Sequence, residues 1–126
     1  MTQEEQLKLL ELTNKLREYN KASYQQYINH TVKEGFTADF YTEVKPFADR
    51  IFITANEWKE LAEQWVKVYR PKYIYTMQLT NAYDQLLETS VAAFQKDTKS
   101  KRFKDTIKSI DYILDTIIIQ IKQPTE

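Results

Sequence analysis

The chain contains no cysteine, and this absence excludes three kinds of chemistry. Without that residue type there is no disulfide framework, no thiolate metal site and no cysteine nucleophile. The absence also agrees with a cytoplasmic location, where disulfides are rare. Residues 1–14 have no apolar core of the signal-peptide type, so we expect a cytoplasmic protein.

Glycine is almost as scarce, because Gly35 is the only one in the sequence. Phosphate-binding loops and nucleophile elbows need several glycines, which let the backbone approach a ligand or adopt a positive φ. A Rossmann fingerprint, a Walker A loop and a G-x-S-x-G elbow are therefore excluded. A mostly antiparallel β fold is also disfavoured, because its turns usually require more glycine.

Long apolar runs and an excess of one charge are missing as well. The longest apolar run, Val91 to Phe94, is far too short to cross a bilayer. The 18 basic and 18 acidic side chains cancel, with a net charge of −2 over residues 1–95 and +2 over residues 96–126. We therefore expect no membrane insertion, and no nucleic-acid partner of the kind that a basic surface would attract.

The clearest pattern that is present lies between residues 103 and 121. Large apolar side chains recur there with steps of 4, 3, 4, 3 and 4, which places them on one stripe of a helix. Three more isoleucines widen the apolar face, so several neighbouring helices are needed to cover it. The stripe consists of Phe103, Ile107, Ile110, Leu114, Ile117 and Ile121, and the widening residues are Ile113, Ile118 and Ile119.

Similar periodicity before this segment predicts an all-α protein, a single up-down-up-down four-helix bundle over residues 1–126. One point stays open, because Ile51 to Ile53 could instead be extended, with the second helix starting at the capping box formed by Thr54 and Glu57. In the up-down topology the connectors 34–46 and 97–101 share one end, and the turn at 70–73 lies at the other end beside both termini. The expected helices span residues 3–33, 46–69, 74–96 and 100–123.

Three strings in this order and separation carry a resemblance to a known family: DFYTEVKPF at 39–47, RPKY at 70–73 and KRFKD at 101–105. Together they resemble the YppE-like family of small uncharacterised proteins from Gram-positive bacteria. The resemblance implies a cytoplasmic four-helix bundle with no assigned activity. In that family RPKY can be followed by an apolar residue and a histidine, whereas Ile74 and Tyr75 follow it here.

Catalytic and metal-binding constellations are not found. His30 is the only histidine, and Glu34 four residues later adds just one further ligand, too few for a zinc site. A carboxylate-bridged di-iron bundle needs Glu-x-x-His on two helices, and this string does not occur. Because only His30 could activate a serine, we expect no enzyme, no metal and no cofactor.

Two clusters remain as candidate sites. Lys99, Lys101, Arg102 and Lys104 gather where the last helix should begin, and form a candidate patch for an anion or a partner. Alternatively, Glu34, Asp39 and Glu43 from the same end neutralise this patch, or its side chains are simply solvated. The second cluster is a candidate interaction surface near the middle turn, since tyrosine and arginine are enriched in protein interfaces. It comprises Tyr69, Arg70, Lys72, Tyr73 and Tyr75.

These patterns favour a non-catalytic bundle that binds another protein or associates with itself. The alternative is a small-molecule site between helices, in which an anionic ligand binds beside Arg102. For the tyrosines a structural interpretation competes, because tyrosine also suits the rim of a bundle, with its ring buried and its hydroxyl in water.

Overall fold

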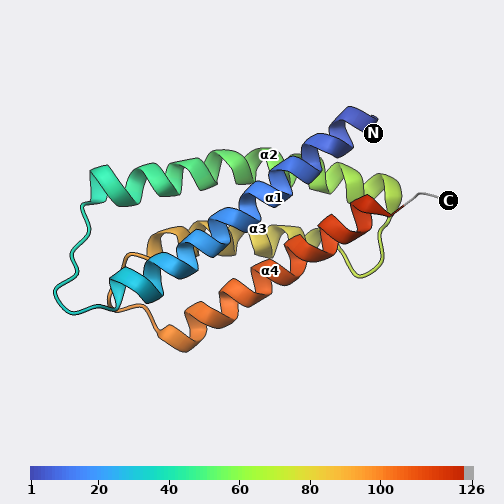
Figure 1. Cartoon of the computed structure of the whole chain (residues 1–126). Coiled ribbons are helices and arrows are strands. Elements are labelled where there is room, and N and C mark those ends of the chain that lie inside the picture. The colour runs from blue at the N-terminus through green and yellow to red at the C-terminus, as the bar shows by residue number, and fades with distance from the viewer. Residues whose placement is uncertain (124–126) are drawn as a thin grey trace.

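The chain folds into four long helices that pack side by side, and the computed structural model describes residues 1–123. Two five-residue π-helical turns, η1 (Tyr27–Thr31) and η2 (Phe40–Val44), flank the first connector. Figure 1 shows neighbouring helices running in opposite directions, and α1 closes the ring by packing against α4. The predicted all-α up-down bundle is confirmed. Its helices are α1 (Gln3–Gln26), α2 (Lys45–Tyr69), α3 (Thr76–Ala92) and α4 (Ser100–Lys122).

The two ends of the bundle are built from the segments that the up-down topology requires. At the connector end, the hydroxyl of Tyr27 donates to the carbonyl of Thr98 at 3.0 Å, and that of Thr31 donates to the carbonyl of Ala93. At the other end, the side-chain amide of Gln6 donates to the hydroxyl of Tyr69 at 2.9 Å. Figure 1 shows the start of α1 and the end of α4 beside the loop between α2 and α3 at this second end, and the C-terminus itself lies outside the described residues. The predicted distribution of the connectors is confirmed.

The stripe on α4 forms the centre of the core, as its spacing predicts. Ile110, Leu114 and Ile117 are 0% exposed, and Phe103 and Ile107 are also buried. Ile110, Leu114 and Ile117 pack in a main cluster with leucines of α1 and α3 and with the inner side of α2, which includes Trp58 and Trp65. Phe103 and Ile107 pack in a second cluster with Tyr27 and Ala93 at the connector end. One expectation is wrong, because Ile119 is 59% exposed and does not belong to the buried face.

The second helix has the longer of its two possible forms. α2 begins at Lys45, carries Pro46 in its first turn and continues through Ile51 to Ile53. Helical structure starts even before α2, with the π-helical turn η2 that leads directly into it. Asp39 caps η2 by accepting a hydrogen bond from the backbone N–H of Thr42 at 2.9 Å. This bond favours the charged carboxylate and lowers the pKa of Asp39.

The ends of the first and third helices differ from the prediction. Regular α-helix stops at Gln26 rather than near residue 33, because η1 widens the last turns where Tyr27 and Thr31 bond to the α3–α4 connector. α3 spans Thr76–Ala92 instead of residues 74–96. It ends early because the hydroxyl of Thr98 donates to the carbonyl of Ala92 at 2.7 Å, while the next backbone amides form tight turns.

The buried face of α3 carries several small side chains in addition to leucines. Ala82, Thr89 and Ser90 are buried on it beside Leu79 and Leu86, whereas Val91 and Phe94 are only partly buried. Small side chains let a helix approach its neighbours closely, so they can occupy a core position that a search for large apolar residues overlooks.

Candidate functional site

The predicted interaction surface lies on the loop between α2 and α3, but its first residue does not contribute to it. Tyr69 is partly buried, packs against the main core, and accepts the hydrogen bond from Gln6. This is the rim arrangement, in which the ring is covered and the hydroxyl has a polar partner. Tyr69 therefore belongs to the support of the loop rather than to an exposed surface.

The rest of the loop is fixed in an unusual conformation. Arg70 and Tyr73 have φ angles of 45° and 68°, and within residues 1–123 they are the only non-glycine residues at positive φ. Such a conformation costs an L-residue of order 1 kcal/mol and persists where the surroundings impose it. Here Ile74 is buried to 1% exposure, and the side chain of Gln120 on α4 donates to the carbonyl of Lys72.

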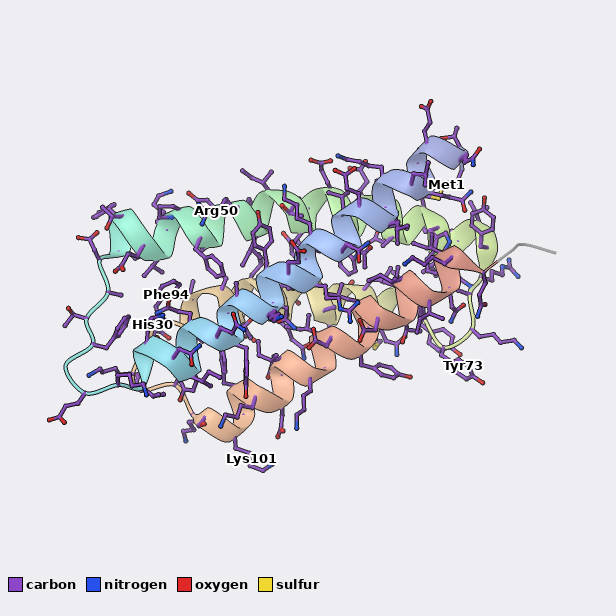
Figure 2. The ribbon with its side chains drawn as sticks, in the orientation of Figure 1. Met1, His30, Arg50, Tyr73, Phe94 and Lys101 are labelled. Atoms are coloured by element: carbon purple, nitrogen blue, oxygen red, sulfur yellow. The ribbon has the colours of Figure 1, made fainter. Side chains whose placement is uncertain are left out.

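This fixed loop and the first turn of α3 present three large side chains to solvent. Tyr73, Tyr75 and Met77 are 68%, 65% and 75% exposed. Figure 2 shows Tyr73 on the outer side of the loop, pointing away from the helices. The sequence interpretation missed Met77, although its place two residues after Tyr75 was a usable signal. We call Arg70, Lys72, Tyr73, Tyr75 and Met77 the tyrosine surface.

The predicted basic patch lies at the opposite end, where α4 begins, and Figure 2 shows Lys101 there. Two cavities of about 300 and 470 Å³ adjoin the patch between α3 and α4, and both are lined by Lys99, Arg102 and Thr106. Lys101 pairs with Asp105 at 3.1 Å, whereas Lys104 lines neither cavity.

Within residues 1–123, no ion pair with Glu34, Asp39 or Glu43 neutralises the basic patch, so of the two structural alternatives only solvation of the patch agrees with the contacts. The carboxylate of Asp39 caps η2, and that of Glu43 accepts from the backbone N–H of Asp39 at 2.8 Å. Neither these two acids nor Glu34 forms an ion pair with the patch in this part of the chain. Arg102 thus faces a cavity without a carboxylate partner from the first connector.

The structure places no group of metal-binding side chains around His30 among the described residues. His30 is exposed at the connector end, near the end of η1 (Figure 2). Over residues 1–123, no three side chains of histidine, cysteine, aspartate or glutamate come together in a way that could hold a metal ion. In the same part of the chain, none of the helices combines the length and the apolar character that crossing a membrane requires.

Comparison with known proteins agrees with the fold and gives no activity. Residues 13–121 match the model of a bacterial domain of unknown function, DUF1798. The uncharacterized protein YppE of Bacillus subtilis is 29% identical over 109 residues, which cover 86% of this chain and 88% of YppE. The crystal structure of YppE superposes with a TM-score of 0.79 at 30% identity, covering 90% of this chain and 91% of YppE.

A second solved structure is closer in shape to this chain than the YppE crystal structure. It is a protein of unknown function from Listeria innocua, with a TM-score of 0.88 and 32% identity over 94% of both chains. The matched residues include all of α2 and α3 and the greater part of α1 and α4, so the similarity covers the bundle as a whole. The chain therefore belongs to the DUF1798 family, the bacterial family of YppE.

Proposed function

We propose that this protein acts without catalysis, in the cytoplasm, by binding another protein through the tyrosine surface. The single observation that supports this most is the exposure of three large side chains, each about two-thirds or more. Tyr73 and Tyr75 lie on a loop held in a strained conformation, and Met77 lies beside them in the first turn of α3. Tyrosine and methionine are enriched in protein interfaces, and a preorganised loop loses little conformational entropy on binding.

The charges of the surface favour a partner with acidic side chains. Within residues 1–123, neither Arg70 nor Lys72 forms an ion pair. Two copies meeting symmetrically through this surface would bring their cations together, and like charges in an interface are repulsive. A partner segment with carboxylates around an apolar side chain would match both the cations and the tyrosines.

The test compares proteins captured from a bacterial lysate by the wild type, by a Tyr73→Ser/Tyr75→Ser variant, and by a Tyr112→Ser control. Tyr112 is 60% exposed on α4 and lies outside the tyrosine surface. We expect the wild type to capture an acidic protein. Its affinity should be at least tenfold lower for the double variant and unchanged for the control, and it should decrease as the salt concentration rises. All three proteins should keep stabilities within about 0.5 kcal/mol of one another.

Two outcomes would contradict this proposal. The first is a strictly monomeric protein that captures nothing specific, or captures the same proteins with all three baits. The second is a dimer in light scattering that the double variant abolishes, because the occupant would then be a second copy rather than an acidic partner.

A second candidate function is the binding of a small anion beside Arg102. It is favoured by the two cavities there and by the engagement of Asp39 and Glu43 elsewhere. With inorganic pyrophosphate as the probe at low salt, we expect Arg102→Gln to weaken binding by roughly ten- to a hundredfold, since it removes a charged hydrogen bond. Calorimetry would measure this, with Lys104→Gln as the control. Equal losses in both variants would indicate diffuse attraction and no site.

A further inference from the structure

A surface cavity of about 450 Å³ lies between α1 and α4, away from both sites described above. Its size is in the range of small-molecule sites, and its walls carry two cations and two carboxylates. None of these charged residues was singled out in the sequence, because α1 and α4 are far apart along the chain. The lining residues are Asn14, Arg17, Glu18, Lys21, Tyr24, Ile107 and Asp111.

The carboxylate of Asp111 is held in place by a buried amide. Asn20, which is 1% exposed, donates to Oδ1 of Asp111 at 2.8 Å and to the carbonyl of Ile107 at 3.0 Å. The amide's own Oδ1 is buried without a hydrogen-bond partner among residues 1–123. A buried unpaired acceptor is destabilising, so packing alone does not account for an asparagine at this position. Its effect is to orient a carboxylate that lines the cavity.

The guanidinium of Arg17 forms an ion pair with α4, between side chains that are 52% and 42% exposed. Its Nε lies 3.0 Å from Oδ1 of Asp115, and this ion pair leaves the two terminal nitrogens of Arg17 available as donors. Lys21, one turn further along α1, adds a second cation, and within residues 1–123 it forms no ion pair. One anion of the cavity is thus oriented by a hydrogen bond from the facing helix, and one cation is paired with a carboxylate of the facing helix.

We propose that this cavity binds a small zwitterion of the amino-acid class. A purely anionic ligand would be attracted by Arg17 and Lys21 but repelled by Asp111 and Glu18. A purely cationic ligand would be attracted by the two carboxylates but repelled by the two cations. A ligand with a carboxylate for the cations and an ammonium group for Asp111 matches both. The proposal is independent of the tyrosine surface, because it uses a different face of the bundle.

The experiment titrates each of the common amino acids, at millimolar concentrations, into the ¹⁵N-labelled full chain and follows amide chemical shifts. At least one amino acid is expected to shift the side-chain amide of Asn20 together with backbone amides near residues 17–24 and 107–111. The same amino acid with its carboxylate amidated, or with its amino group acetylated, is expected to bind at least tenfold more weakly, since each change removes one charged contact.

An isosteric variant tests the role of Asp111 without removing the partner of Asn20. Asp111→Asn keeps an oxygen that can accept from Asn20 but loses the charge, so binding should weaken roughly ten- to a hundredfold. Asp105→Asn, on the same helix and outside this cavity, should bind as the wild type does. The proposal is overturned if no amino acid shifts these resonances, or if Asp111→Asn binds as tightly as the control.

Discussion

Ile117→Ala is expected to lower the free energy of unfolding by about 2–5 kcal/mol, whereas Ile119→Ala should change it by less than about 0.5 kcal/mol. The two isoleucines lie two positions apart on α4, but Ile117 is 0% exposed and Ile119 is 59% exposed. Truncating the buried side chain removes its burial and leaves a cavity that the surrounding helices fill only partly. Truncating the exposed Ile119 removes little buried apolar area, because most of this side chain is already in contact with water in the folded protein.

Urea unfolding followed by far-ultraviolet circular dichroism measures both effects on one scale. Domains of this kind are stable by about 5–15 kcal/mol, so the loss in Ile117→Ala is a large fraction of the total and moves the midpoint strongly. The slope of the transition should stay constant, which shows that the same surface is exposed on unfolding. Equal losses for the two variants would mean that α4 does not bury the face described here.

The sequence predicted the fold well wherever one side of a helix is covered by large apolar residues. The stripe from Phe103 to Ile117 is buried because its period matches the helix and its residues are too large to leave in water. Ile119 shows the limit of this reasoning, since periodicity does not say how wide a face the neighbours can cover. On α3, Ala82 and Ser90 were missed because close packing of small residues leaves no hydrophobic signal.

How well each candidate site could be predicted depends on how close its residues lie to one another in the sequence. The residues of the tyrosine surface lie close together in sequence, so Arg70, Lys72, Tyr73 and Tyr75 could be found by composition alone. Met77 was missed, and the conformation at Arg70 and Tyr73 could not be predicted. The cavity between α1 and α4 joins residues that are about ninety positions apart, such as Lys21 and Asp111. Its charges look like ordinary solvated side chains until the helices are placed side by side.

A further large effect is expected at Thr13, whose replacement by valine should lower the free energy of unfolding by about 1–3 kcal/mol. Thr13 and Trp58 are both 0% exposed, and the indole Nε1–H of Trp58 donates to the hydroxyl of Thr13 at 3.1 Å. That hydroxyl in turn donates to the carbonyl of Leu9 at 2.7 Å. Valine has the same shape but accepts no hydrogen bond, so the buried indole N–H loses its partner.

A double-mutant cycle separates this loss from simple packing. Trp58→Phe removes the N–H, so Thr13→Val made in that background should cost about 1 kcal/mol less than it does in the wild type. Thr116→Val is the matched control, because Thr116 makes the same kind of bond to the carbonyl four residues earlier but has no indole donor. It should stay within about 0.5 kcal/mol of the wild type. If Thr13→Val costs the same in both backgrounds, the hydrogen bond from Trp58 contributes nothing to stability, and Trp58 is held by packing alone.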